Sequence, residues 1–279
     1  QINVTGIETN ATWQYTTDGG TTWSTGTGSN FTLAAGTYTD GKVLVRQTDL
    51  AGNTGSNASL GAITVDGTAP TAPTVAMLTA NSTTPTLTGT ATVGSGETLK
   101  VTVSGATYTV TPSGGNWSLN LASATPSSGT LTALTNGSTY SVTATVTDAA
   151  GNATSDTTSS ELVIDTTAPA APGATLTSDT GSSGTDKVTN TGTVTVSSIE
   201  SGATWQYSTN GGTSWSTGTG TSFTLAAGTY ATDAVRVRQT DAAGNVSTET
   251  KLAAITVDQT NPAAPTLALA SDTGSSGTD

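Results

Sequence analysis

Apolar and polar residues alternate along most of this chain. Such a period of two places every second side chain on one face of a β-strand. Short turn sequences, such as Asp18-Gly19-Gly20 and Asn210-Gly211-Gly212, separate the alternating runs at hairpin spacing. The pattern therefore predicts many short strands with buried alternate residues. The clearest runs are Leu99/Val101/Val103, Trp117/Leu119/Leu121, Tyr140/Val142/Ala144/Val146, Trp205/Tyr207 and Val235/Val237.

The composition favours strands over helices. Thr and Ser make up more than a third of the 279 residues, and strong helix formers are scarce. The length suggests two or three domains. No apolar run approaches the roughly 18 residues of a membrane span, so we expect no membrane insertion. Gln1 does not begin a signal peptide, and we expect the chain to be an internal piece of something longer.

One stretch of sequence occurs twice. The residues from Ala11, ATWQYTTDGGTTWSTGTGSNFTLAAGTY, return from Ala203 as ATWQYSTNGGTSWSTGTGTSFTLAAGTY, at an offset of 192 residues. A unit of different sequence lies between the two copies. Repetition on this scale is typical of tandem domains, so we expect at least three domains in a row.

Three segments share one closing formula, in which the Asp of an Asp-x-Ala-Gly-Asn loop is followed 17 residues later by Asp-x-Thr-x-Pro. The loops are 49–53, 148–152 and 241–245, and the second elements are 66–70, 165–169 and 258–262. The spacing of the complete units, 99 and 93 residues, suits an immunoglobulin-like sandwich of about seven strands. We therefore expect an all-β fold, with tandem immunoglobulin-like β-sandwiches in an elongated rod.

The closing formulas also predict the domain boundaries. We expect a repeat that lacks its first strand, a complete repeat of a second type, a complete repeat of the first type, and the opening segment of a further repeat. In that order they cover residues 1–70, 71–169, 170–262 and 263–279. The chain is thus expected to be cut within a repeat at both ends.

Charge and residue types exclude several functions. Without Cys or His, the chain has no disulfides, Cys/His zinc sites, thiol nucleophiles or triads that need imidazole. Its net charge of −12 disfavours nucleic acid and anionic lipid. No pair of carboxyl groups is placed in a cleft, as glycosidase chemistry would require. We expect no catalytic residues and no enzymatic activity, and cations are the natural partners.

The strand order of an immunoglobulin-like sandwich indicates where the acidic residues lie. The B–C and F–G loops share the end at which the chain enters the domain. In the third unit we expect strand B at about residues 193–197, strand C from Trp205 and strand F at about residues 234–240. Glu200 then lies in the B–C loop, and Asp241 begins the F–G loop. Both are expected to face the end of the preceding unit.

Each junction between units is thus predicted to gather three carboxylates. Such a group is repulsive unless a cation lies between its members, and calcium suits flexible oxygen ligands. Asn152 and Asn245 could complete the shell through side-chain or nearby backbone carbonyls. The alternative is that the Asp-Ala-Ala-Gly-Asn segment is only a turn and that the linker Asp residues are solvated. The predicted groups are Asp66, Glu97 and Asp148 at one junction, and Asp165, Glu200 and Asp241 at the next.

A second acidic loop runs from Ser178 through Asp179 to Asp186. Two Asp residues in a loop rich in Gly and Ser can wrap a calcium ion, although the spacing does not match an EF-hand. A flexible turn without metal is an equal alternative.

The units resemble the tandem bacterial Ig-like repeats of giant type I-secreted adhesins, of the biofilm-associated or RTX type, which carry D-x-A-G-N loops and V-D-x-T-A-P linkers. The resemblance covers essentially the whole chain. It implies that linker, B–C and F–G acids bind calcium between domains. Glu97 departs from the pattern because its loop is longer and places the acid late. The implied ligands are Asp66 with Asp148, Asp165 with Glu200 and Asp241, and the half-sites Glu8 with Asp49 and Asp258.

A segment around Asp18, from Thr16 to Trp23, fits the Asp-box pattern of sialidase-like propellers, where it is a structural hairpin. The second copy has Asn210 in place of Asp18. An exposed Trp on such a hairpin could stack on a sugar ring. Trp23 and Trp215 therefore keep a carbohydrate- or surface-binding module open as an alternative function, against the simpler interpretation that they are core aromatics.

The expected function is that of a calcium-rigidified extender of a bacterial cell-surface adhesin, an extracellular rod that supports attachment and biofilm formation. Its expected partners are neighbouring repeats of the same array. An accessory domain of a secreted hydrolase is a third possibility. Because residues 264–270 alternate like a first strand, with Leu267 and Leu269 on one face, head-to-tail self-association is also predicted.

Overall fold

The computed structural model describes residues 1–270, and all the regular elements in that range are β-strands. The expected all-β fold class is confirmed. None of the described residues belongs to a helix long and apolar enough to cross a membrane. The predicted repeat boundaries stay a prediction. The described chain forms two compact units. The first is made of Gln1–Leu78, Thr84–Leu134 and Thr139–Val163, and the second of Thr79–Thr83, Thr135–Ser138 and the described residues from Ile164.

Residues 2–65 form three small antiparallel sheets, with strand orders β3-β2-β6-β7, β1-β4 and β5-β8. Trp13, Phe31, Leu33 and Val43 form the buried core between them. Tyr15 stacks on Phe31 with ring centroids 4.2 Å apart. The strands are β1 (Ile2–Asn3), β2 (Thr12–Thr16), β3 (Ser24–Thr25), β4 (Asn30–Phe31), β5 (Gly36–Tyr38), β6 (Leu44–Thr48), β7 (Ala58–Ser59) and β8 (Ile63–Val65).

Residues 78–164 contain a five-stranded sheet of order β14-β12-β11-β16-β17 and the pair β10-β13. The predicted alternation is clear in β11, where Leu99, Val101 and Val103 are buried and the residues between them are exposed. The strands are β9 (Leu78–Ala80), β10 (Thr86–Thr90), β11 (Thr98–Val103), β12 (Ala106–Val110), β13 (Asn116–Asn120), β14 (Ser128–Gly129), β15 (Ser138–Tyr140), β16 (Val142–Thr147), β17 (Ala153–Ser155) and β18 (Leu162–Ile164).

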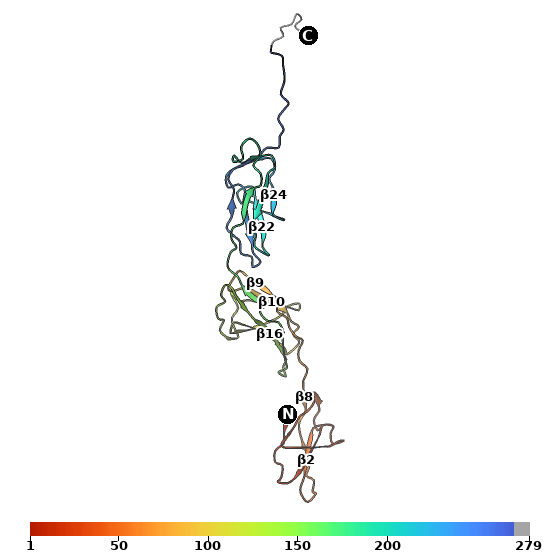
Figure 1. Cartoon of the computed structure of the whole chain (residues 1–279). Helices are drawn as coiled ribbons and strands as arrows, with labels where there is room; N and C mark the ends of the chain where they lie inside the picture. The colour runs from red at the N-terminus through yellow and green to blue at the C-terminus, as the bar shows by residue number, and fades with distance from the viewer. Residues whose placement is uncertain (271–279) are drawn as a thin grey trace. The chain divides into compact units, whose positions relative to one another are not determined.

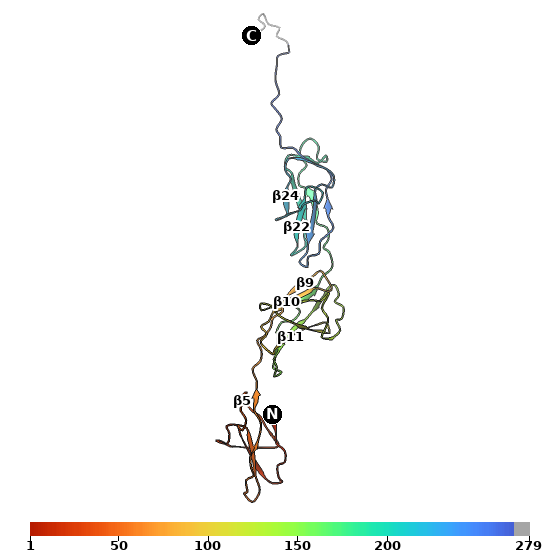
Figure 2. The same ribbon diagram turned by 180° about the vertical axis from the view of Figure 1, so that it is seen from behind.

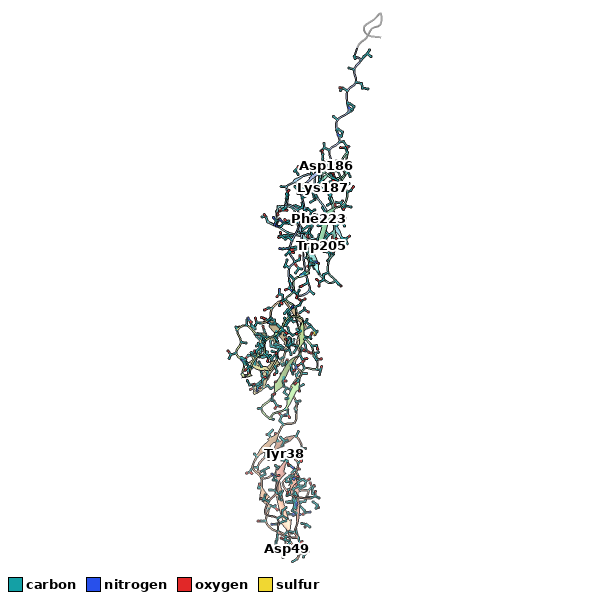
Figure 3. The ribbon with its side chains drawn as sticks, turned by 60° about the vertical axis from the view of Figure 1, so that its left-hand side comes forward. Tyr38, Asp49, Asp186, Lys187, Trp205 and Phe223 are labelled. Carbon is teal, nitrogen blue, oxygen red and sulfur yellow. The ribbon has the colours of Figure 1, made fainter. Side chains whose placement is uncertain are left out.

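Residues 173–257 form the sheets β23-β22-β26-β27, β19-β21-β24 and β20-β28-β25, with β20 parallel to β28. Figures 1 and 2 show β22 and β24 side by side in one sandwich, and Figure 3 labels Trp205 and Phe223, whose ring centroids lie 6.1 Å apart in its core. The strands are β19 (Gly173–Leu176), β20 (Val188–Thr189), β21 (Thr193–Ser197), β22 (Thr204–Ser208), β23 (Ser216–Thr217), β24 (Ser222–Thr224), β25 (Gly228–Tyr230), β26 (Arg236–Thr240), β27 (Thr250–Lys251) and β28 (Ile255–Val257).

Two glycines allow a Trp ring to lie against its own hairpin. A Cβ atom added to Gly26 would lie 2.1 Å from the Trp13 ring, and one added to Gly218 would lie 2.3 Å from the Trp205 ring. Each indole donates its Nε1–H to a backbone carbonyl at 3.0 Å, which satisfies its polar atom. The same packing of a Trp ring against a glycine of its own hairpin therefore occurs in both copies of the repeated sequence.

Candidate functional site

The three Asp-x-Ala-Gly-Asn loops have the same closed geometry. In each, the Asn backbone N–H donates to Oδ1 of the Asp at 2.8 Å, and the Asn Nδ2 donates to Oδ2 at 2.8 Å. The Gly of each loop has a positive φ, between 91° and 93°, which glycine adopts readily. Each loop thus holds its Asp carboxylate in a fixed orientation, directly after a strand. The pairs are Asp49 with Asn53 after β6, Asp148 with Asn152 after β16, and Asp241 with Asn245 after β26.

These hydrogen bonds keep the Asp residues ionised. Hydrogen bonds from the Asn53 and Asn152 side chains hold the pKa of Asp49 and of Asp148 below the usual value. For Asp241, burial acts to raise the pKa, but the hydrogen bonds from Asn245 outweigh it and the pKa is again lowered. All three loops therefore present a negative charge at neutral pH.

The Asn side chains of two loops also bind the linker Asp residues predicted to lie beside them. Nδ2 of Asn152 donates to the backbone carbonyl of Asp66 at 3.1 Å, and Nδ2 of Asn245 donates to that of Asp165 at 2.8 Å. We call these two hydrogen bonds the Asn–linker contacts. Asn152 and Asn245 were expected to offer an oxygen to a calcium ion, whereas here each donates an N–H to the linker backbone.

Gln239 makes a second attachment to the linker that follows Asp165. Its Nε2 donates to the carbonyl of Ala170 at 2.7 Å, and its Oε1 accepts the backbone N–H of Glu200 at 2.8 Å. Gln239 is 1% exposed and lies in β26, two residues before Asp241. Gln239 therefore connects strand β26, which leads into the F–G loop, to both the B–C loop and the linker. Sequence reasoning missed this residue, although the alternation Val235, Val237, Gln239 places it on the buried face.

The acidic side chains themselves do not gather in the described chain. Among residues 1–270, no three carboxylate or imidazole groups lie close enough together to hold a metal ion. The linker carboxylates make local turns, since Oδ1 of Asp66 accepts the N–H of Thr68 at 2.9 Å and Oδ1 of Asp165 accepts that of Thr167 at 3.0 Å. Calcium at these positions stays a prediction.

The other predicted ligands also have local partners. Oε2 of Glu97 accepts the N–H of Gly94 at 2.7 Å, and Oδ1 of Asp258 accepts that of Thr260 at 2.9 Å. The backbone N–H of Glu8 donates to Oε1 of Gln47 at 2.8 Å, as that of Glu200 does to Gln239. Figure 3 shows Asp49 at one end of its sandwich.

The acidic loop at 178–190 is closed by hydrogen bonds. Oδ2 of Asp179 accepts the backbone N–H of Lys187 at 2.9 Å and lies 3.8 Å from its Nζ, while Oδ1 is buried without a hydrogen-bond partner. Oδ1 of Asp186 accepts the N–H of Val188 at 3.0 Å. Figure 3 shows Asp186 and Lys187 at one end of the sandwich. Asp179 thus shapes the turn around Lys187, and a metal here stays a prediction.

The Trp residues considered for sugar stacking are covered on one face. The guanidinium of Arg46 lies 3.9 Å from the ring centroid of Trp23, and that of Arg238 lies 4.0 Å from Trp215. Each arginine is held in place by two hydrogen bonds to a Gln side chain. A cation over an indole face contributes about 0.5–1 kcal/mol at exposed sites. This arrangement stabilises the sheet surface and does not favour a carbohydrate-binding function.

The sheets, their cores and the repeated loop and linker contacts define the chain as a protein of tandem β-sandwiches. Residues 77–166 match the family model of the bacterial Ig-like domain. This part of the chain is therefore similar to a bacterial Ig-like domain, in agreement with the resemblance found in the sequence. No curated protein matches the sequence.

Three solved structures are similar to the chain at low identity. The fibronectin(III)-like modules of Clostridium thermocellum CbhA are 12% identical, with a TM-score of 0.38, over 66% of this chain and 93% of that one. A 1.5-MDa bacterial ice-binding adhesin is 21% identical, with a TM-score of 0.33, over 88% of this chain and 85% of that one. A tetra-tandem repeat from the extending region of a large adhesion protein is 20% identical, with a TM-score of 0.27, over 91% of this chain and 69% of that one.

Proposed function

We propose that this chain is a spacer segment of a bacterial cell-surface adhesin, in which tandem Ig-like domains hold a distal ligand-binding region away from the cell. The proposal draws on the bacterial Ig-like match of residues 77–166 and on the repeated text of the chain. Ig-like domains of this kind are generally non-enzymatic. A spacer requires domains that are stable by themselves and linkers that resist bending.

The Asn–linker contacts are the observation that carries this proposal. A linker that bends freely has no need of side chains that bind its backbone. Here the carbonyls of Asp66 and Asp165 each accept a hydrogen bond from an Asn, and the carbonyl of Ala170 accepts another from Gln239. Both Asn residues are fixed by their own Asp, so little side-chain entropy is lost when they hold the linker. The repeated contact therefore favours a stiff array.

Calcium is the second part of the proposal. Asp165, Glu200 and Asp241 would hold one ion, and Asp66, Glu97 and Asp148 another, because hard cations prefer carboxylate oxygens. The ion would neutralise the repulsion between these acids and bridge the linker to the loops. The net charge of −12 supports a cation as partner. An extracellular location and a role in biofilm attachment belong to the same proposal.

Small-angle X-ray scattering of the 279-residue chain tests the spacer role. The matched variants are Asn152→Ala with Asn245→Ala, which remove both Asn–linker contacts, and Asn53→Ala as the control, which removes the same loop bond to Asp49. We expect the double variant to scatter as a more flexible chain than the control, with the circular dichroism of β-structure unchanged. Equal flexibility of the double variant and the control would refute the stiffening role.

A further inference from the structure

Two carboxylates lie along one edge of β16, the strand labelled in the middle sandwich of Figure 1. The N–H of Val142 donates to Oε2 of Glu161 at 3.0 Å, and the N–H of Ala144 donates to Oδ1 of Asp156 at 2.7 Å. Farther along the same edge, β17 pairs with residues 145–147 of β16 in an ordinary antiparallel ladder. The two acidic side chains therefore take the place of a paired strand over the first half of β16.

The two carboxylates share a neighbouring hydroxyl. Oγ1 of Thr158 donates to Oδ2 of Asp156 at 3.0 Å, and the same hydroxyl also acts to lower the pKa of Glu161. The backbone positions that bind the two acids are two residues apart on β16, which is about 7 Å along a strand. All three side chains thus converge beside one short segment of backbone. We call Asp156, Thr158 and Glu161 the Glu161 site.

Glu161 has one carboxylate oxygen without a partner. The residue is 1% exposed, and its Oε1 is buried without a hydrogen bond. Burial acts to raise the pKa of Glu161, but hydrogen bonds, chiefly that from the Val142 N–H, outweigh it and the pKa is lowered. Buried charges in proteins are normally paired with a base or bound to a metal ion. Oε1 therefore presents negative charge at a point where a cation is expected.

No basic side chain supplies that cation. Within residues 1–270, neither of the ion pairs involves Asp156 or Glu161. Lys100 is the only Lys or Arg between residues 78 and 164. It occupies an exposed position of β11, in register with Thr145 of β16. The two acids thus have no protein counter-ion in their own sandwich.

The third unit solves the same problem differently. At the positions of the two acids, counted back from the linker Asp, it has Glu249 and Ala254. Glu249 forms an ion pair with Arg236 at 2.8 Å, and the middle unit has Thr143 at the position of Arg236. The third unit thus combines one acid with its own base, whereas the middle unit combines two acids with none.

We propose that the Glu161 site binds one calcium ion between the carboxylates of Asp156 and Glu161, with the Thr158 hydroxyl and water as further ligands. Calcium takes oxygen ligands in flexible geometry, and two carboxylates balance its charge. The ion gives the buried Oε1 the partner that it lacks. It also holds residues 156–161 against β16, where no strand pairs with it. This ion is distinct from those proposed between domains and does not depend on the spacer role.

Backbone NMR of the 279-residue chain tests this site, because the N–H groups of Val142 and Ala144 donate to its two carboxylates. We expect both amide signals to shift and to reach saturation as calcium is added up to about 10 mM. The amides of Val235 and Val237, at the same positions of the third unit, are the control and should shift much less. If Oε1 binds only water, the signals of Val142 and Ala144 will not respond to calcium, and the proposal is overturned.

Charge-removing variants provide the second readout. Glu161→Gln with Asp156→Asn keeps an oxygen acceptor for each N–H group, so the fold should be retained. Equilibrium dialysis should then show one bound calcium ion fewer per chain than in the wild type. The control, Glu249→Gln with Asp40→Asn, removes two negative charges elsewhere and should bind as much calcium as the wild type. An unchanged calcium count in the first variant, or an equal loss in the control, would overturn the proposal.

A third variant separates this ion from one between domains. Asp148 follows β16 directly and belongs to a proposed junction site. In Asp148→Asn, the calcium-dependent shifts of Val142 and Ala144 should persist, whereas Glu161→Gln should reduce them. Loss of both shifts in Asp148→Asn alone would assign them to the junction and contradict a separate ion at Glu161.

Discussion

Asp18 and Asn210 occupy equivalent hairpin positions and hold their turns with the same acceptor geometry. Oδ1 of Asp18 accepts the backbone N–H groups of Thr21 and Thr22 at 2.8 and 3.0 Å. Oδ1 of Asn210 accepts that of Ser214 at 3.0 Å. The position therefore requires an oxygen at one point in space, and it does not require a negative charge.

Asp18→Asn is expected to keep the folded state at neutral pH and to make it less sensitive to acid. Hydrogen bonds from the Thr16 and Thr22 side chains hold the pKa of Asp18 well below its ordinary value of 3.8. Its stabilising contribution is thus complete above that value and is lost as the pH falls through the folded-state pKa. Asn has no such titration. Thermal melts at about pH 7 and about pH 2 measure the difference, and Asp18→Ala should be less stable at both.

Glu161 is a buried carboxylate whose loss should destabilise the sandwich that contains it. It is 1% exposed, and its Oε2 accepts the backbone N–H of Val142 at 3.0 Å. Glu161→Ala would leave that buried N–H without an acceptor, at a cost of about 1–3 kcal/mol. Calorimetric unfolding measures the shift, with Asp40→Ala on the surface as a control that should change stability by less than about 0.5 kcal/mol. Equal effects of the two substitutions would contradict the role of Glu161.

Residue types in the sequence indicated which segments lie near one another, but not which atoms are in contact. Asp148 and Asn152 were expected beside Asp66, and the contact is present through an Asn N–H and a backbone carbonyl. Side-chain amides can donate or accept, and only the three-dimensional positions decide between the two. The pairing of Arg46 with Trp23 was missed for a related reason, because cross-strand neighbours depend on register rather than on spacing.

At the level of elements, strands with strong alternation were predictable. β21 covers Thr193–Ser197, the range expected for strand B, and β26 covers Arg236–Thr240 within the range expected for strand F. Short strands without alternation, such as β3 and β20, carry no such signal because two residues cannot show a period. The parallel pairing of β20 with β28 arises from the loop at 178–190, whose closure depends on Asp179.

Gly26 tests the packing of a strand against its Trp. In Gly26→Ala, the added methyl would overlap the Trp13 ring, which is buried at 4% exposure and cannot move freely. Overpacking of this kind costs about 1–3 kcal/mol. Gly61→Ala in the same sandwich meets no atom within 4 Å and serves as the control. Chemical denaturation followed by Trp fluorescence should show a loss of stability for Gly26→Ala alone.

At the level of the whole molecule, removal of calcium tests the metal proposal. Residues 2–65 and 173–257 each contain an apolar core, and residues 78–164 bury apolar side chains such as Val101 and Trp117. We therefore expect a chelator to leave the far-ultraviolet circular dichroism largely intact. The melting temperature should fall and the scattering profile should become more flexible, because an ion that binds only the folded, aligned state stabilises that state. Magnesium at equal concentration is the control, since it binds such flexible oxygen sites poorly. Unchanged melting and scattering in excess chelator would exclude calcium.

Two nearly identical sandwich sequences stand apart in this chain, at an offset of 192 residues, with a unit of different sequence between them. Neighbouring domains of like sequence are prone to exchange strands while they fold, because each half-folded domain offers the other a matching edge. During synthesis, strands β10 to β13 of the intervening unit leave the ribosome before strands β21 to β24 do. The intervening strands have a different sequence from the repeated unit. The intervening unit therefore keeps the two like sequences from being immediate neighbours in the chain.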